Sequence, residues 1–352
     1  MTIVSKVIKV LVVDDSALVR QILSQGLSQD KGIDVIATAP DPFVARDKVV
    51  KLKPDVITLD IEMPRMDGIE FLQRLMPQFP VPVVVVSSLT EKGKTTTFEA
   101  LKAGAVDFVT KPSSQFGGQG LNNILCELRD KIKVASQVDV SKWKSKEKQS
   151  SIPKVRSDKA LSETTDKVIA IGASTGGTEA LRRILVTLPA VFPGIVITQH
   201  MPPGFTKSFA DSLNRDCQME VLEASDGDRV LPGRILIAPG GLQMTVVRSG
   251  GTYLVKCKEG AKVSGHCPSV DVLMHSVAQA AGANSIGVVL TGMGRDGADG
   301  LLSMRKAGSR ALAQDEKTSV VYGMPKEAFE NGAAEKVLPL ENIPNQLMSW
   351  LS

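Results

Sequence analysis

A serine in a tight turn is the first residue of this sequence that could do chemistry. Ser174 stands in Gly172-Ala173-Ser174-Thr175-Gly176, a G-x-S-x-G pattern, directly after the apolar run Val168–Ile171. The next residues, 178–185, have helical spacing. A strand that ends in such a turn and opens a helix has the local design of a nucleophile elbow, which exposes a serine hydroxyl to substrate and base. An ordinary tight turn of small residues explains the short pattern equally well.

A serine nucleophile needs a base, and the chain has three histidines. His200 follows the apolar run Gly194–Gln199, so it leaves the carboxyl end of a predicted strand, as Ser174 does. Asp296 follows the predicted strand Ile286–Leu290 through a glycine-rich loop. Because the carboxyl ends of parallel strands meet at one edge of a sheet, the three side chains can converge there. The sequence therefore favours a catalytic triad of Ser174, His200 and Asp296.

A rival set of partners for the serine stays open. The α/β-hydrolases use the chain order serine, acid, histidine, which would pair Asp226 or Asp228 with His266 or His275. Both acids lie in a polar loop, His266 lies in another loop, and His275 lies in a helical stretch. Neither histidine leaves a strand, so this set is the weaker one. The favoured order also indicates that the turn is not an α/β-hydrolase elbow by descent.

Backbone N–H groups near the serine are needed to stabilise an oxyanion. The turn that contains Thr175 offers one such donor. Met293 offers a second, because Gly292 and Gly294 on either side of it let that stretch of backbone approach closely. We therefore expect the oxyanion hole at Thr175 and Met293.

A second group of polar residues follows predicted strands in the first third of the chain. Asp14 and Asp15 follow the first strand, Asp60 ends the third, Ser87 follows the fourth, and Lys111 follows the fifth. Crowded carboxylates repel one another unless a cation lies among them, and oxygen ligands of this kind suit Mg²⁺. A lysine and a hydroxyl would hold phosphate oxygens. This pattern predicts a site at which an aspartate is phosphorylated.

The elements expected to position these residues alternate between short apolar runs and helical patterns. In the first half the strands are predicted at 10–13, 35–37, 55–59, 83–86 and 107–109, and the helices at 16–27, 42–51, 68–76 and 92–103. That alternation predicts a five-stranded parallel, flavodoxin-like α/β domain. In the second half the strands are predicted at 168–171, 194–198, 234–238 and 286–290. We expect a doubly wound, mainly parallel sheet there, with an antiparallel hairpin at 243–258.

The two halves are separated by a stretch of different composition. Residues 141–151 are rich in lysine and serine and contain almost nothing to bury, so they cannot offset their own ordering entropy. We predict a first domain at 1–133, a flexible basic linker at 134–166, and a second, catalytic domain at 167–352.

The bulk composition restricts the class of protein. With 352 residues, 43% hydrophobic residues and a net charge of +4, the chain has room for two cores and does not look like a nucleic-acid binder. Its four scattered cysteines indicate a reducing compartment. The amino terminus is no signal peptide and no apolar run is long enough to span a bilayer. We expect a cytoplasmic monomer that does not insert into membranes.

The first third resembles a response-regulator receiver domain. The similarity rests on Asp14-Asp15, on Leu59–Gly68 around Asp60, on Ser87, and on Thr110-Lys111-Pro112. It implies that Asp60 accepts a phosphoryl group from a histidine kinase and that Mg²⁺ is bound by Asp15, Asp60 and the carbonyl of Glu62, with Asp14 assisting. It also implies that Ser87 is the switch hydroxyl and that Lys111 contacts the phosphoryl group.

The chain outside the linker resembles the chemotaxis protein-glutamate methylesterases, which are esterases regulated by a receiver. The matching motifs are residues 172–177, 199–202, 237–240, 268–271 and 290–297. The resemblance implies a triad of Ser174, His200 and Asp296, an oxyanion hole at Met293, and no cofactor for the ester reaction. It implies removal of methyl groups from glutamate esters on chemoreceptors, deamidation of receptor glutamines, and a place at the receptor arrays. It further implies that the unphosphorylated receiver covers the active site.

Two other functions are weighed against this one. A transcription factor with a receiver would need a helix-turn-helix and a basic face, whereas the second half is too large and carries strands. A receiver fused to a hydrolase of small esters would use the same residues, so only the substrate distinguishes it. The sequence does not indicate which receptors or glutamates are served.

Overall fold

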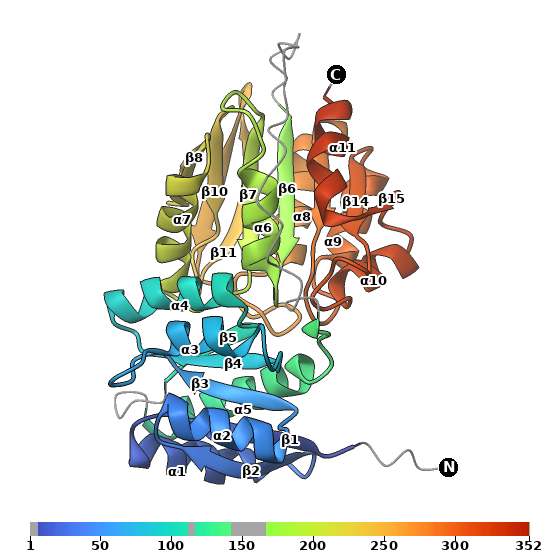
Figure 1. Ribbon diagram of the computed structural model, residues 1–352. Coiled ribbons are helices and arrows are strands. Elements are labelled where there is room, and N and C mark those ends of the chain that lie inside the picture. Colours follow the sequence, from blue (N-terminus) through green and yellow to red (C-terminus); the bar gives the residue numbers. More distant parts are fainter. Residues whose placement is uncertain (1–5, 112–116, 142–166, 352) are drawn as a thin grey trace. The chain divides into compact units, whose positions relative to one another are not determined.

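The computed structural model describes residues 6–111, 117–141 and 167–351 (Figure 1). The chain divides into two compact units, Met1–Ser150 and Ser151–Ser352. Most of the predicted linker, residues 142–166, lies outside the described residues. Its first two residues belong to helix α5, which ends at Ala135.

The first unit contains a five-stranded parallel sheet, as the sequence predicts, and its strand order is β2-β1-β3-β4-β5. Its strands are β1 (Ile8–Val13), β2 (Ile33–Ala39), β3 (Val56–Asp60), β4 (Val83–Ser87) and β5 (Asp107–Thr110). Its helices are α1 (Ala17–Leu27), α2 (Pro42–Leu52), α3 (Gly68–Leu75), α4 (Glu91–Ala103) and α5 (Gly117–Ala135). Strands β3 and β4 are buried along their whole length. Burial on both faces explains their unbroken apolar runs.

Local sequence fixes where these helices begin. Asp41, Asp67 and Thr90 each accept a hydrogen bond from the backbone N–H three residues later, which satisfies a donor that the first turn leaves unpaired. Gly104 ends α4 with a φ of 117°, a conformation that a side chain would strain. The cap at Asp67 thereby fixes where the loop that follows Asp60 ends.

The second unit contains a seven-stranded sheet, parallel throughout, with the order β15-β14-β13-β6-β7-β10-β8. Its strands are β6 (Val168–Ala173), β7 (Gly194–Gln199), β8 (Glu220–Glu223), β10 (Arg234–Ile237), β13 (Ser285–Val289), β14 (Arg310–Gln314) and β15 (Lys336–Leu338). The predicted hairpin is present as β11 (Gln243–Ser249) and β12 (Thr252–Lys258), and the short strand β9 (Arg229–Val230) joins it in a second sheet. The fold class predicted from the sequence is confirmed, although β8, β9, β14 and β15 were not predicted.

The helices of this unit are α6 (Gly177–Leu185), α7 (Phe205–Asp216), α8 (Val270–Ala281), α9 (Ala298–Lys306), α10 (Met324–Glu330) and α11 (Ile343–Ser349). Short 3₁₀ turns lie at Gly282–Asn284 and Leu340–Asn342. Helix α8 packs between β6 and the hairpin, and its Leu273 and Val277 are fully buried in the core. At Gly172, a Cβ atom would lie 2.1 Å from Cγ1 of Val270, so only glycine lets α8 begin this close to β6.

The order of the strands positions the candidate catalytic residues. Strand β6 lies in the middle of the sheet between β13 and β7. Their carboxyl ends, after which Asp296, Ser174 and His200 occur, are therefore neighbours. Across the described ranges, no helix combines the length and apolar character that crossing a membrane requires.

Candidate active site

The turn after β6 holds Ser174 between two neighbouring strand ends. Its backbone N–H donates to the carbonyl of Thr291 over 3.0 Å, and its carbonyl accepts from Gly177 over 2.7 Å. The left-handed conformation of the turn falls on Gly176, whose φ is 78°. Ser174 does not have the positive φ that would strain it. The turn therefore exposes the serine by a different backbone geometry from the strained elbow that its pattern suggests.

His200 and Asp296 form a buried pair. They follow β7 and β13, the two strands on either side of β6, after which Ser174 lies. The Nε2 atom of His200 lies 2.8 Å from Oδ2 of Asp296, and their side chains are only 6% and 1% exposed. The backbone N–H of His200 donates to the carbonyl of Ala173, which ties the histidine to the residue before Ser174. The second ring nitrogen, Nδ1, is buried and makes no hydrogen bond to any described residue. Nδ1 is thus the nitrogen left to act as a base.

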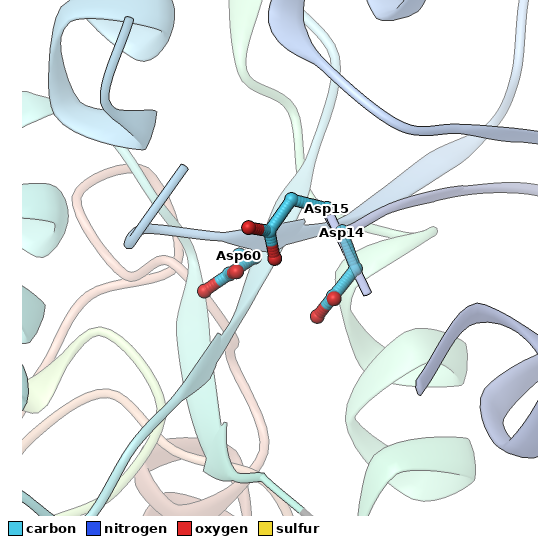
Figure 2. A group of neighbouring side chains, drawn as sticks. All are labelled: Asp14, Asp15 and Asp60. Atoms are coloured by element: carbon cyan, nitrogen blue, oxygen red, sulfur yellow. The ribbon is translucent and has the colours of Figure 1, made fainter. Parts of the chain in front are cut away.

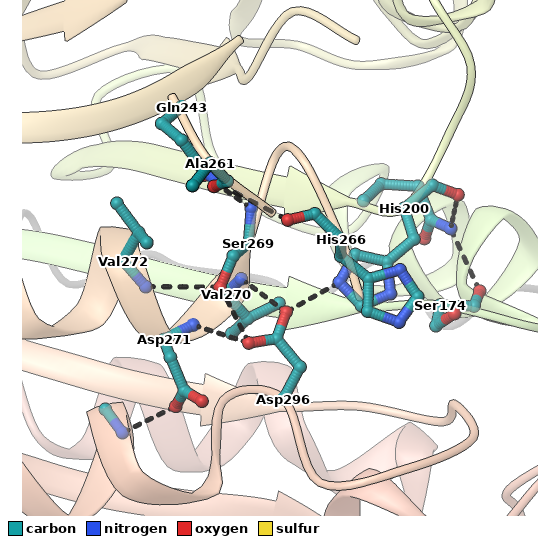
Figure 3. Close-up of polar contacts among 12 residues, drawn as sticks. Ser174, His200, Gln243, Ala261, His266, Ser269, Val270, Asp271, Val272 and Asp296 are labelled. Atoms are coloured by element: carbon teal, nitrogen blue, oxygen red, sulfur yellow. Dashed lines mark hydrogen bonds and ion pairs between the residues drawn. The ribbon is translucent and has the colours of Figure 1, made fainter. Parts of the chain in front are cut away.

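Asp296 is held at the amino terminus of α8 (Figure 3). Its carboxylate accepts hydrogen bonds from the hydroxyl of Ser269 at 2.7 Å and from the backbone N–H groups of Val270 at 2.7 Å and Asp271 at 3.1 Å. Burial alone would raise the pKa of Asp296, but the contact with His200 and these donors lower it to about 2. The carboxylate therefore stays ionised and can stabilise a cation on His200.

A second buried carboxylate stands behind the first. Asp271 accepts a hydrogen bond from the N–H of Gly300 at 2.7 Å, at the start of α9. Burial, together with the nearby charge of Asp296, raises the pKa of Asp271 to about 6. Asp271 therefore links the first turn of α8, which donates to Asp296, with the first turn of α9, which follows Asp296 in the chain.

The two predicted oxyanion donors lie beside the serine. A Cβ atom on Gly292 would lie 2.6 Å from Cβ of Ser174, so the backbone before Met293 passes close to the side chain of Ser174. The carbonyl of Gly292 accepts from the N–H of Met324 at 2.8 Å, which fixes that loop. Thr291 Oγ1 donates to the carbonyl of Thr175 at 2.9 Å and joins both loops. Among the described residues, none accepts a hydrogen bond from the N–H of Met293.

The side chain of Gln199 joins the serine and the histidine. Its Nε2 donates to the carbonyls of Ser174 at 2.9 Å and His200 at 3.3 Å. Gly177 makes room for it, because a Cβ atom there would lie 2.1 Å from Oε1 of Gln199. Gln199 was predicted only as part of the matching stretch 199–202, without a role for its amide, because a single glutamine at a strand end does not indicate any one chemistry.

His266 lies in the site, although not as the rival arrangement requires. Its ring stacks on that of His200 with centroids 3.6 Å apart and an angle of 10° between the planes (Figure 3). The carboxylate of Asp226 accepts from the N–H of Cys257 and that of Asp228 from the N–H of Ser225. The fourth member of that arrangement, His275, is exposed on α8. The geometry favours the pairing of His200 with Asp296.

The first unit gathers the predicted acidic residues at the carboxyl edge of its sheet. One oxygen each from Asp14, Asp15 and Asp60 lies within 4.8 Å of the others (Figure 2). Lys111 Nζ lies 2.7 Å from Asp60 and 3.3 Å from Asp14. Burial raises the pKa of Asp60 to about 6, against the lowering effect of Lys111, and it raises the pKa of Asp14 as well.

This donor set fits a magnesium ion. Carboxylate oxygens are the ligands that Mg²⁺ prefers, and a dication would relieve the repulsion and desolvation that raise the pKa of Asp60. The N–H of Glu62 donates to Asp60 at 3.1 Å, while its carboxylate accepts from Ser88. The Glu62 backbone is thus held next to Asp60 and its side chain is engaged elsewhere.

The predicted switch residue is connected to helix α4. Ser87 is buried, and its hydroxyl donates to the carbonyl of Gly93 at 3.1 Å. It also accepts a hydrogen bond from the hydroxyl of Thr97 at 2.5 Å. A change in the direction of the Ser87 hydroxyl must therefore alter two contacts with the first two turns of α4.

In comparisons with known proteins, the two units of the chain match two different families. Residues 169–347 match the family described as "CheB methylesterase", and residues 10–116 match "Response regulator receiver domain". A protein-glutamate methylesterase/protein-glutamine glutaminase of Syntrophotalea carbinolica is 59% identical over 99% of this chain and 98% of its own. One of the same name from Escherichia coli is 51% identical over 98% of this chain and 97% of its own.

A solved structure is similar to the second unit. The CheB methylesterase catalytic domain of Thermotoga maritima is 40% identical, with a TM-score of 0.51, and the match covers 52% of this chain and 98% of that one. The similarity therefore includes nearly the whole of that catalytic domain.

Proposed function

Because this chain belongs to the CheB methylesterase family, we propose that it removes methyl groups from glutamate γ-methyl esters of chemoreceptors, under control of its receiver domain, with Ser174 as the nucleophile. The same chemistry on a glutamine side chain makes it a deamidase. Both reactions attack an acyl carbon that carries a poor or moderate leaving group, which is the task of a serine, histidine and aspartate set.

In the proposed mechanism, Nδ1 of His200 takes the proton of the Ser174 hydroxyl as its oxygen attacks the ester carbonyl. The N–H groups of Met293 and Thr175 stabilise the oxyanion, and Asp296 stabilises the imidazolium. His200 returns the proton to the departing methanol, or to ammonia from a glutamine. A water molecule, deprotonated by His200, then hydrolyses the glutamyl ester on Ser174 and leaves a glutamate.

The observation that carries this proposal is the buried contact between His200 and Asp296, 2.8 Å long, next to a serine held at the adjoining strand end. The hydrogen bond from Ser174 to His200 is absent in the described geometry, and such bonds often tighten only when substrate is bound.

The test is release of methanol from methylated receptor membranes. Ser174→Ala should abolish the activity, because it removes the nucleophile while the receiver remains able to accept phosphate. Release at the wild-type rate by Ser174→Ala would refute the proposal. A parallel panel of small esters tests the second candidate, a general esterase, which would hydrolyse them as efficiently as the receptor.

The receiver is proposed to accept a phosphoryl group on Asp60 from a histidine kinase. Asp15, Asp60 and the carbonyl of Glu62, with Asp14 assisting, would hold Mg²⁺, which would neutralise negative charge on the incoming phosphoryl group. Lys111, already 2.7 Å from Asp60, would contact the phosphoryl oxygens.

Regulation is proposed to run through Ser87. A phosphoryl group on Asp60 offers new acceptor oxygens, and the Ser87 hydroxyl would turn toward them and leave Gly93 and Thr97. Helix α4 would then shift, and the catalytic domain would be uncovered. Deleting the receiver should raise basal activity if its role is inhibitory, whereas a loss of activity would indicate a purely activating receiver.

The remaining proposals concern where the protein works. We expect a cytoplasmic monomer at the receptor arrays that uses no cofactor for the ester reaction, no nucleic acid and no membrane insertion. A sedimentation experiment with receptor membranes tests the location, and light scattering tests the monomer.

A further inference from the structure

We infer that His266 is a positioning residue that covers one face of the catalytic imidazole and stabilises its cationic form. This inference rests on the proposed function, because it assigns a role to a residue that acts through His200. It begins from the stack of the two rings, whose centroids lie 3.6 Å apart.

The backbone presents His266 in a defined way. Val263 and His266 exchange both of their backbone hydrogen bonds, at 3.0 and 2.9 Å, which makes a minimal antiparallel hairpin. The two residues between them have positive φ values, 52° for Ser264 and 85° for Gly265. This is the pattern of a type I′ turn, in which a non-glycine residue at the first position is held in a conformation that most residues avoid.

The short hairpin formed by Val263 and His266 is also connected to the start of α8, where Ser269 holds Asp296. Gln243 donates from Nε2 to the carbonyl of His266 at 3.3 Å, and its Oε1 accepts from the N–H of Ser269 at 2.8 Å. Ser269 in turn donates to Asp296. The side chain of Gln243, on β11, thus fixes the position of the His266 backbone relative to Ser269. Ser269 in turn holds Asp296, the partner of His200. A chance contact between the rings of His266 and His200 would not require that Gln243 hold both His266 and Ser269.

The chemistry of the stack depends on charge. During the proposed reaction His200 becomes an imidazolium, and the π face of a neutral imidazole attracts a cation. Among the described residues, Asp296 is the carboxylate hydrogen-bonded to His200, at the edge of its ring, and the backbone N–H of Asp271 donates to Asp296. His266 therefore complements Asp296, one acting on the face of the ring and the other on its edge.

The test measures kcat and KM of the full chain, with phosphodonor, on methylated receptor membranes. His266→Ala should lower kcat by about tenfold, between the effects expected for an exposed and for a fully desolvated cation–π contact, because His266 is half-buried; KM should stay unchanged within about twofold. His266→Phe keeps an aromatic face and should recover most of kcat. The matched control is His275→Ala, since His275 is exposed on α8 and should behave as wild type.

Three results would overturn the inference. They are an unchanged kcat in His266→Ala, a change in KM alone, or a failure of His266→Phe to recover activity although its thermal unfolding midpoint equals that of the wild type. Ser174→Ala, run in parallel, separates the two levels. If it stays active, the proposed function fails; if it is inactive while His266→Ala is fully active, only the role of His266 fails.

Discussion

Replacing Ser269 by alanine removes a hydroxyl that both holds Asp296, the proposed acid of the triad, and caps helix α8. The hydroxyl lies 2.7 Å from Asp296 Oδ1 and 3.4 Å from the N–H of Val272. Both Ser269 and Asp296 are almost fully buried, so solvent does not screen the contact. A hydrogen bond to a charged group contributes about 1.5–3 kcal/mol to stability, and an N-cap contributes about 1 kcal/mol. We therefore expect the free energy of unfolding to fall by about 3 kcal/mol.

That loss of stability should lower the unfolding midpoint of the catalytic unit by about 6–12 °C, given its size. The catalytic effect is smaller, because Val270 and Asp271 still donate to Asp296. If half of the hydrogen-bond energy, about 1.4 kcal/mol, is expressed in the transition state, kcat falls about tenfold. Differential scanning calorimetry measures the first effect, and methanol release at a temperature where the variant is folded measures the second.

Two control variants make this prediction specific. Ser269→Thr keeps the hydroxyl and should retain most of the activity. Ser276→Ala removes a hydroxyl from the same helix, one that accepts a hydrogen bond from the N–H of Val246 at 2.8 Å and has no contact with Asp296. It should lower stability without lowering kcat. If Ser269→Ala and Ser276→Ala have the same kcat, the orienting role assigned to Ser269 is wrong.

Two further predictions concern the oxyanion loop and the receiver. Gly292→Ala places a Cβ atom 2.6 Å from Cβ of Ser174 and should reduce methanol release at least about 100-fold, the size of a lost oxyanion donor, while phosphorylation stays normal. Equal rates of methanol release from the wild type and from Gly292→Ala would contradict the close approach of Gly292 to Ser174. Because the pKa of Asp60 is raised to about 6, protons should compete with Mg²⁺ below that value, and the apparent affinity should fall up to about tenfold per pH unit. Calorimetric titration of the full chain at pH 5 and pH 7.5 checks this, and equal affinities would contradict it.

The meeting of Ser174, His200 and Asp296 at one edge of the sheet could be predicted because it depends on a simple rule. Ser174, His200 and Asp296 each follow an apolar run, and parallel strands deliver their carboxyl ends to one edge. The rule brings these residues together only if β6 lies between β13 and β7. The structure has this strand order. The acidic site of the receiver was predictable for the same reason.

The supporting residues could not be found in this way. Ser269 is 27 positions from Asp296, and the contact exists only because α8 begins against Gly172. His266 was predicted to lie in a loop, although the pair Ser264-Gly265 is a dipeptide typical of tight turns. Strand β14 escaped prediction because its sequence, Arg-Ala-Leu-Ala-Gln, favours a helix, and only pairing with β13 and β15 makes it extended.

Ser174 becomes acylated in every turnover if it is the nucleophile. The full chain, given a phosphodonor and methylated receptor membranes, can be quenched in acid and digested, and the modified residue identified by mass spectrometry. We expect a glutamyl adduct on the peptide that contains Ser174 in the wild type, and none in Ser174→Ala. An adduct on another residue, or methanol release by Ser174→Ala at the wild-type rate, would contradict the assignment of Ser174 as the nucleophile.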